Sequence, residues 1–479
     1  MSVPGVRSAV VRGIIGAAGY VPYWRLDRSQ IASTFGSGGG KGQRAVASYD
    51  EDTTTMGVEA ARLVMRAAGD VTPAALSFAT ANPAYLDKTN ATAIHAVLRL
   101  DAQVPAYDFG GALRSGVGAL MAALTADRPV LTVVADMRDG LPTSADEANG
   151  GDGGAAVLTG SDGDGPVIAE LLGVGSATEE FIDRWRLPGE TRSKQWEERF
   201  GEVKYLPLGQ EAFDAALKGA ELSADQVDRL IVTGAQPRAV RSIVGRLGVD
   251  REKLVDDLGA SVGWTGTAHP ALALTSALEQ ATPDQVIAVL SLTDGADCLL
   301  FRTTDAIASW SPARTIETQL AASGLVPYGK FLAWRGTVKL DPPRRPEPNR
   351  ISAAIAGRRE AWKYGFVGSR DRSSGAVHLP PAHVSMKGGA VDDMEPAPTA
   401  DELGTISTFT IDRIAYSPSP PIVFAVVDFD GGGRAPVELC DVDADALRMG
   451  DRVEMTFRRL FTADGIHNYF WKARPVRGA

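Results

Sequence analysis

The feature that most constrains this chain is a change of pattern near residue 341. Before that point, short β-rich runs alternate with amphipathic helical stretches, as at 75–80 and 91–100, then 229–234 and 239–247. This alternation is typical of α/β folds with buried sheets. After a Pro-rich, charged stretch at 341–350 come four alternating runs without notable helices, at 404–414, 421–430, 434–441 and 451–460. They predict a small β-barrel.

Composition and charge exclude several classes of protein. A chain of 479 residues with 44% hydrophobic residues can bury large cores. Its net charge of -10 disfavours nucleic-acid binding, which needs clustered Lys and Arg. The longest apolar runs, near 129–135 and 285–292, fall short of the roughly 20 residues of a membrane span. Because the start lacks a signal-peptide core and Cys298 and Cys440 are the only cysteines, we expect a cytoplasmic protein without a disulfide framework.

Five motifs occur in a characteristic order before residue 340. They are GIIGAAGYVPYWRL from Gly13, YDEDTTTMGVEAA from Tyr49, TANPAYLDKTNA from Thr80, DMRDGLPTSADEANGGDGGAAVLTG from Asp136 and VPYGKFLAWRG from Val326. Together they resemble the 3-hydroxy-3-methylglutaryl-CoA synthase branch of the thiolase superfamily, particularly its archaeal and bacterial form.

This resemblance implies an α/β fold of five αβαβα layers over residues 1–340, built from two similar βαβαβ-type halves with the active site between them. It also implies a coenzyme A thioester as substrate, no tightly bound cofactor, and a homodimer or larger assembly.

The resemblance also implies that the four chemical groups of the family are replaced. The synthase nucleophile lies in an A-C-K-A-G-T segment, and the matching A-L-R-S-G-V places Leu113 there. The acid/base glutamate corresponds to Ala81, the histidine to Ala235 and the asparagine to Trp264. Without a thiol no acyl-enzyme forms, so the family's ping-pong condensation has no route.

Four residues near these positions are candidates for catalysis. His269 lies five residues after the lost asparagine and is either a base or a histidine that only satisfies a helix start. Tyr85 and Asp87 lie in a loop expected to border the same pocket, although packing also explains Tyr85. Ser115, on a glycine-rich turn, either donates a hydrogen bond or allows close packing. The other histidines are expected on a surface helix or in the C-terminal part: His95, His378, His383 and His467.

Three cationic residues are candidates for contact with coenzyme A. Arg238 and Arg241 follow the lost histidine, near where the resemblance places cationic partners of the coenzyme A phosphates, and Lys88 flanks the lost glutamate. Ordinary solvated charges are the alternative for the two arginines.

The C-terminal part resembles the OB-fold proteins that partner thiolase-like enzymes, in which a four-cysteine zinc ribbon precedes the barrel. Residues 401–479 match the barrel, and 341–400 correspond to a Pro-rich linker and a degenerate ribbon. The ribbon positions carry Asp371, Ser374, Ser385 and Gly388 in place of thiolates, so we expect no metal.

Three functions fit these observations. The first is an aldol or retro-aldol reaction of a β-hydroxyacyl-CoA, which needs no acyl-enzyme. The second is a condensing acyltransferase of the synthase type, whose acyl group would have to arrive on another protein's thiol. The third is a non-catalytic acyl-CoA-binding subunit that organises a complex with an enzyme of the same pathway.

Overall fold

The first domain is built on one continuous sheet of nine strands. The computed structural model describes residues 10–477. The strand order is β11-β12-β13-β8-β1-β7-β6-β4-β5. The strands are β1 (Arg12–Tyr20), β4 (Ala75–Thr80), β5 (Ala106–Gly110), β6 (Val130–Asp136), β7 (Gly153–Ser161), β8 (Ala169–Ala177), β11 (Arg229–Gly234), β12 (Val286–Leu292) and β13 (Ala296–Thr303).

This sheet consists of two related halves that meet at β1 and β8. These strands pair over two residue pairs, Gly13 with Glu170 and Ile14 with Ala169. On one side the order from the outer edge is β5-β4-β6-β7-β1, and on the other it is β11-β12-β13-β8. A single bridge from Leu254 to Leu230 of β11 occupies the place that β5 has in the first half. The halves are therefore similar in order but unequal in strand number.

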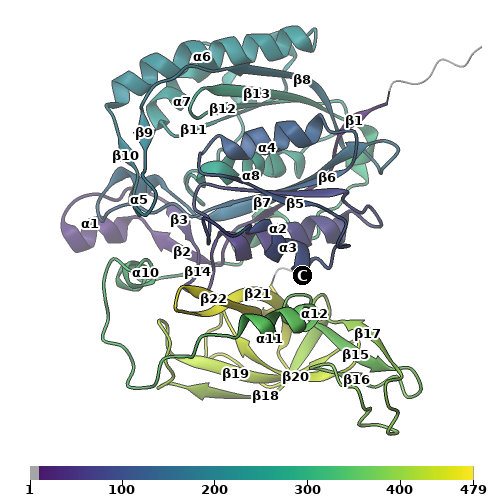
Figure 1. The fold of residues 1–479 in the computed structure, drawn as a ribbon. Helices are drawn as coiled ribbons and strands as arrows, with labels where there is room; N and C mark the ends of the chain where they lie inside the picture. The colour runs from purple at the N-terminus through teal and green to yellow at the C-terminus, as the bar shows by residue number, and fades with distance from the viewer. Residues whose placement is uncertain (1–9, 478–479) are drawn as a thin grey trace, which may run out of the picture.

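Helices cover both halves and give the five αβαβα layers that the sequence predicted (Figure 1). Both faces of each half are covered, which explains why β6 and β12 are continuous buried apolar runs rather than alternating ones. The outer helices are α6 (Glu198–Gly219) and α7 (Pro237–Val244), the central helices are α4 (Ser115–Leu124) and α8 (His269–Leu278), and α2 (Thr53–Ala67) and α3 (Ala91–Val97) face the C-terminal domain.

Smaller elements complete the first domain. One three-stranded sheet has the order β14-β2-β3, and β9 pairs with β10. Their bounds are β2 (Trp24–Asp27), β3 (Gln43–Val46), β9 (Arg184–Trp185), β10 (Lys194–Gln195) and β14 (Gly324–Leu325), with helices α1 (Ser29–Phe35), α5 (Ala145–Asn149), α9 (Ile316–Ala321) and α10 (Tyr328–Trp334).

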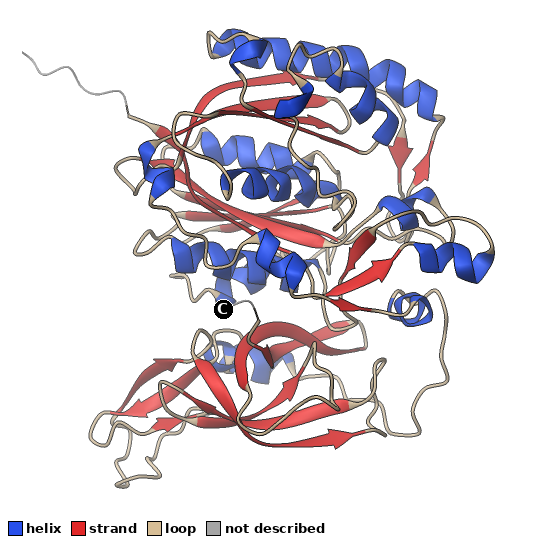
Figure 2. Cartoon of the chain, turned by 180° about the vertical axis from the view of Figure 1, so that it is seen from behind, coloured by secondary structure: helices blue, strands red, loops and turns tan. Residues whose placement is uncertain are grey.

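The C-terminal part contains a small sheet and a closed barrel, seen below the layered domain in Figure 2. The barrel order is β18-β19-β20-β22-β21, and the sheet order is β16-β15-β17. The elements are α11 (Ala353–Arg358), α12 (Glu360–Lys363), β15 (Val367–Asp371), β16 (Val377–His378), β17 (Met394–Pro398), β18 (Leu403–Asp412), β19 (Ile422–Phe429), β20 (Arg434–Leu439), β21 (Arg452–Ala463) and β22 (Ile466–Pro475).

The barrel strand β22 was not predicted from the sequence. Its residues Lys472 and Arg474 are buried, so the strand lacks a simple alternation of apolar and polar residues.

The barrel packs against α2, where Arg62 donates hydrogen bonds to the carbonyls of Met455 at 2.9 Å and Ala400 at 2.7 Å. Among residues 10–477, no helix is long and apolar enough to cross a membrane.

Candidate active site

A cavity of about 380 Å³ lies at the end of β11, beside the turn that leads into α8. It brings together five residues singled out in the sequence. Two are replaced family positions, Ala235 and Trp264, and three are candidates, His269, Arg238 and Arg241. We call this space the strand-end cavity. Ala235 directly follows β11, and Arg238 and Arg241 lie on the next helix, α7. Trp264 and His269 lie in and just after the turn before α8.

The backbone around Trp264 is held by the glycine cluster at 150–154. The Trp264 N–H donates to the carbonyl of Asn149 at 2.8 Å, and its own carbonyl accepts from the N–H of Gly151 at 3.0 Å. A β-carbon at Gly151 would overlap the carbonyl of Val262, so a side chain cannot be accommodated there. Glycine in this motif therefore serves the close approach of two backbone segments.

The Trp264 side chain lies beside two arginines. The guanidinium carbons of Arg138 and Arg184 lie 5.0 Å and 6.0 Å from the centre of its ring. Arg138 pairs with Asp136 at 3.3 Å, and Arg184 pairs with Asp146 at 2.8 Å. The indole and two paired cations thus occupy the region that the family resemblance assigns to an asparagine.

His269 is buried at the start of α8, with 2% of its surface exposed. Its Nδ1 lies 3.2 Å from both the backbone nitrogen and Oγ1 of Thr265. Burial lowers the pKa of His269 to about 4, against the opposing effects of the charge and the backbone carbonyl of Asp257. The imidazole is therefore neutral near pH 7. Nδ1 accepts a hydrogen bond from the backbone N–H of Thr265, so the ring has a partner at the helix start.

The turn before α4 is connected to the turn before α8, but it does not line the strand-end cavity. Leu113 is half-buried, and its carbonyl accepts from Oγ1 of Thr267 at 2.6 Å. Gly116 allows this contact, because a β-carbon there would overlap the Thr267 carbonyl. Ser115 is the first residue of α4, and its hydroxyl donates to the carbonyl of Gly110 at 3.3 Å. The Ser115 hydroxyl therefore bonds within its own turn, and the close approach of the two turns occurs at Gly116.

The loop after β4 leads away from the strand-end cavity. Ala81 is buried, and its carbonyl accepts from Arg186. Tyr85 reaches the C-terminal domain, where its hydroxyl oxygen accepts from the backbone N–H of His467 at 2.8 Å. Asp87 is exposed, and the Lys88 amine donates to Thr92 Oγ1 at 3.0 Å.

The sequence predicted that this loop borders the same pocket as His269. In the structure Tyr85 and Lys88 instead line a different cavity, which shares no lining residue with the strand-end cavity. His467, expected to belong only to the C-terminal part, is packed against Tyr85 with ring centres 4.8 Å apart.

Sequence reasoning missed other lining residues of the strand-end cavity. Arg138 and Asp146 belong to the motif that begins at Asp136, so the motif could have indicated them as lining residues, although the sequence alone gave them no role. Asp257, an exposed lining residue, stood in no motif. Neither cysteine lines this cavity, since Cys298 is buried in β13 and Cys440 lies in the barrel domain.

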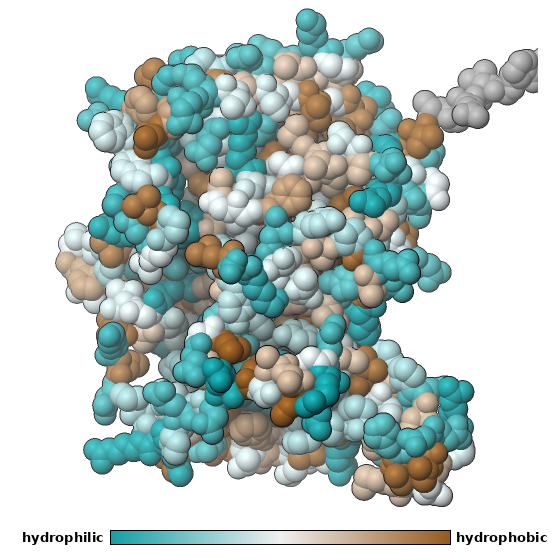
Figure 3. Space-filling model, in the orientation of Figure 1, coloured by the Kyte–Doolittle hydropathy of each residue, from teal (hydrophilic) through white to brown (hydrophobic). Residues whose placement is uncertain are grey.

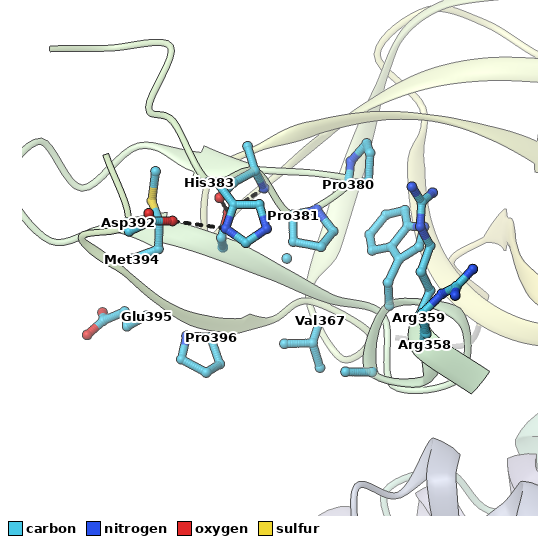
Figure 4. A pocket seen from close by; sticks show the side chains of 15 residues that line it. Arg358, Arg359, Val367, Pro380, Pro381, His383, Asp392, Met394, Glu395 and Pro396 are labelled. Carbon is cyan, nitrogen blue, oxygen red and sulfur yellow. Dashed lines mark hydrogen bonds and ion pairs between the residues drawn. The ribbon is translucent and has the colours of Figure 1, made fainter. Parts of the chain in front are cut away.

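A larger groove, of about 770 Å³, lies between residues 358 and 396, in the segment where the sequence predicts a degenerate ribbon (Figure 4). Arg358 and Arg359 stand at one end, and His383 pairs with Asp392 at the other. Pro380 and Pro381 lie between them, and this open groove has no residue predicted for acyl-CoA chemistry.

Three of the four expected ribbon positions, Asp371, Ser374 and Ser385, belong to a hydrogen-bonded cluster. Asp371 accepts from the hydroxyls of Ser373 at 2.8 Å and Ser374 at 2.5 Å. Hydrogen bonds from Ser374, Ser385 and Ser373 hold the pKa of this carboxyl well below its usual range. Within residues 10–477, no group of three or more His, Cys, Asp or Glu side chains is placed to hold a metal ion.

Comparison with known proteins identifies the class of each domain. Residues 217–298 match the family model for the C-terminal part of 3-oxoacyl-[acyl-carrier-protein] synthase III. Residues 399–458 match the model for the C-terminal OB-fold domain of ChsH2. The chain therefore combines a thiolase-like domain with a ChsH2-type OB-fold domain.

The first domain is similar to hydroxymethylglutaryl-CoA synthases. That of Methanopyrus kandleri is 27% identical over 346 residues, covering 68% of this chain and 98% of the synthase. That of Thermococcus sibiricus is 27% identical over 294 residues, covering 59% of this chain and 83% of the synthase.

Solved structures show the same fold. MvaS in complex with 3-hydroxy-3-methylglutaryl coenzyme A has a TM-score of 0.58 at 20% identity, covering 72% of this chain and 95% of MvaS. The 3-oxoacyl-(acyl carrier protein) synthase III of Pseudomonas aeruginosa has a TM-score of 0.53 at 20% identity, covering 62% of this chain and 99% of that enzyme.

Proposed function

We propose that this chain binds an acyl-CoA thioester in the strand-end cavity and makes or breaks a C–C bond of a β-hydroxyacyl-CoA by an aldol or retro-aldol route. The observation that carries the proposal is that Ala235, Trp264 and His269 line one cavity of a thiolase-like domain, while Leu113 stands at the position of the nucleophile. A retro-aldol reaction needs a proton acceptor and stabilisation of an enolate, but no acyl-enzyme.

The reaction balances without a protein nucleophile. In the cleavage direction a base removes the β-hydroxyl proton, the Cα–Cβ bond breaks, and its electron pair passes to the thioester enolate. The β-carbon becomes a carbonyl, and Cα takes up a proton. His269 is the proposed base, which requires the substrate hydroxyl to replace one of its present hydrogen-bond partners. The Asp257 carboxylate is a second acceptor on the cavity wall.

The two arginines at the cavity support binding of the coenzyme A phosphates. Arg238 and Arg241 are both exposed lining residues, and Arg238 is already paired with Glu202. Arginine suits phosphate because its guanidinium presents several donors in a fixed plane. The solved complexes of MvaS with 3-hydroxy-3-methylglutaryl coenzyme A and of a related synthase with coenzyme A are consistent with this class of ligand.

The test is to incubate the purified chain with a panel of β-hydroxyacyl-CoA thioesters and follow three signals. Retro-aldol cleavage releases a carbonyl compound, trapped as its hydrazone, while total thioester stays constant. Condensation instead consumes thioester and releases free coenzyme A. Binding without either change supports the non-catalytic acyl-CoA-binding subunit. Acyl transfer to the chain, seen as a mass increase on an internal peptide, would contradict the proposed route.

A second candidate is a condensing enzyme of the hydroxymethylglutaryl-CoA synthase type, favoured by the similarity of the first domain to those synthases. Because Leu113 offers no thiol, this function requires an acyl group delivered on another protein's thiol, such as a carrier protein. Condensation that appears only with an acylated carrier protein would support it over the aldol route.

We also propose a cytoplasmic homodimer, with a partner enzyme of the same pathway. The outer strand β5 has one unpaired edge, and Tyr107 on it is 59% exposed. Such an edge is normally covered in a native protein. Light scattering should give the mass of two chains, and Tyr107→Asp should shift that mass toward one.

A further inference from the structure

A second cavity, of about 500 Å³, lies where the two domains meet. Its walls come from α3, from the segment containing α11, and from the hairpin that joins β21 to β22. In Figure 3, apolar side chains gather in the region where Figure 1 places α11. We call this space the seam cavity. Its apolar walls are formed by Ala93, Ala96, Ile351, Ala353, Ala356 and Ile466.

One buried polar group in the seam cavity lacks a partner. Thr54 is 1% exposed, and its hydroxyl makes no hydrogen bond within residues 10–477. Buried polar groups in folded proteins are nearly always hydrogen-bonded. The neighbouring Tyr469 is different, because its hydroxyl donates to Asp52 at 2.8 Å. Thr54 is therefore an unsatisfied polar group at the wall of this cavity.

Tyr85 supplies a second donor with a defined direction. Its hydroxyl oxygen already accepts from the backbone N–H of His467 at 2.8 Å. No acceptor for the Tyr85 proton occurs in the described part of the chain. A ligand that meets this hydroxyl must therefore accept a hydrogen bond.

The charges at the seam cavity balance. Lys88 and Glu360 are both exposed lining residues of opposite sign. The Lys88 amine is bound to the Thr89 carbonyl at 2.9 Å and to Thr92 Oγ1 at 3.0 Å. A cavity of this size, mostly apolar, with a few convergent polar groups and at a domain boundary, has the character of a small-molecule site. Its charge balance favours an uncharged ligand.

We propose that the seam cavity binds a small, mainly apolar, uncharged molecule whose carbonyl oxygen accepts hydrogen bonds from Thr54 and Tyr85. This site is separate from the proposed acyl-CoA site and does not depend on it. Because both domains supply its walls, a bound ligand stabilises their association by mass action.

The experiment uses the full chain and 2-decalone, an uncharged bicyclic ketone, with octanoate as the anionic comparison. Calorimetric titration should show one molecule of 2-decalone bound per chain, and saturating ketone should raise the Tm. Tyr85→Phe and Thr54→Val each remove one hydroxyl and should weaken binding about tenfold. Ala96→Trp fills the cavity and should abolish binding. Tyr107→Phe, which removes a hydroxyl outside the cavity, is the matched control and should bind as the parent does.

Circular dichroism establishes that each variant is folded, and the Tyr85 and Ala96 variants remain decisive if Thr54→Val does not fold. The proposal is overturned if 2-decalone does not bind, or if Tyr85→Phe and Ala96→Trp leave its affinity unchanged. Tighter binding of octanoate that is lost in Lys88→Met would overturn the assignment to an uncharged ketone. Turnover of acyl-CoA by Ala96→Trp tests the strand-end cavity separately.

Discussion

Nη1 of Arg458 in the barrel lies 3.0 Å from Oε1 of Glu51 in the first domain, and both side chains are buried. Arg458 also pairs with Asp441 of its own barrel at 2.7 Å, and Lys472 pairs with Asp50 at 2.8 Å. The acidic segment before α2 thus supplies the counter-charges for buried cations of the barrel. Without the barrel, the buried carboxylates of Asp50 and Glu51 would lose these cationic partners, so the two domains depend on each other for stability.

Arg458→Met should therefore destabilise the whole chain. Removing one partner of a buried ion pair costs about 3–5 kcal/mol, because the other charges stay buried without compensation. Urea denaturation should show this loss. Arg452→Met is the matched control, since its pair with Asp430 is exposed and such pairs are worth at most about 1 kcal/mol. Equal effects of the two substitutions would contradict the role of the buried network.

Acid should weaken the same interface. Burial opposes ionisation of Asp50, but Lys472 and Arg458 outweigh it and lower its pKa to about 2 from an ordinary 3.8. A lowered carboxyl pKa contributes stability that is present above pH 3.8 and is lost as pH falls toward 2. The Tm of the chain should fall in that range, and Asp50→Asn should lower the Tm at pH 7 while flattening its fall in acid. An unchanged acid profile in Asp50→Asn would show that Asp50 does not control it.

Leu113→Cys should not restore synthase activity. A thiol at this position would still lack the acid/base and orienting groups, because Ala81, Ala235 and Trp264 stand at the other three positions. Incubation with acetyl-CoA and acetoacetyl-CoA, followed by assay of free coenzyme A, should show no condensation. Substantial condensation by this single variant would mean that the residue matching is wrong.

The ribbon should contain no stoichiometric zinc. Asp371, Ser374, Ser385 and Gly388 provide no thiolates, and the Asp371 carboxylate instead accepts hydrogen bonds from the hydroxyls of Ser373 and Ser374. Elemental analysis of the purified chain tests the first statement. Asp371→Ala should increase proteolysis in the ribbon, whereas the exposed Asp393→Ala should not. One zinc per chain would refute the expectation.

His269→Ala should lower the turnover by about a hundredfold or more, if His269 is the base, with acyl-CoA affinity nearly intact. Because burial lowers its pKa to about 4, the rate should rise near that pH and stay level from pH 5 to 8. His95→Ala, on the surface of α3, is the control. A loss of thermal stability in His269→Ala with turnover retained would assign His269 to packing and move the proposed proton-transfer role to Asp257, the other acceptor on the cavity wall.

The sequence by itself determined the layered fold and several elements. Strands β4 and β11 have the predicted bounds, and β6 and β12 lie on the two longest apolar runs of the sequence, because strands covered on both faces are largely apolar. The order of motifs also identified the type of each domain, and the match to family models bears this out. Local sequence carries such information because burial and periodicity act on neighbouring residues.

Only the tertiary structure decided where the polar groups meet. Strand β22 could not be recognised from its sequence, because Lys472 and Arg474 look like surface residues. Both are buried, and they pair with Asp50 and Glu59 of the first domain, more than 400 residues away in sequence. Tyr85 was expected to border the same pocket as His269, yet its hydroxyl accepts a hydrogen bond from His467 of the barrel across the domain boundary. A short polar motif shows which donors, acceptors and charges need partners. Which residues become those partners depends on how distant segments of the chain pack together.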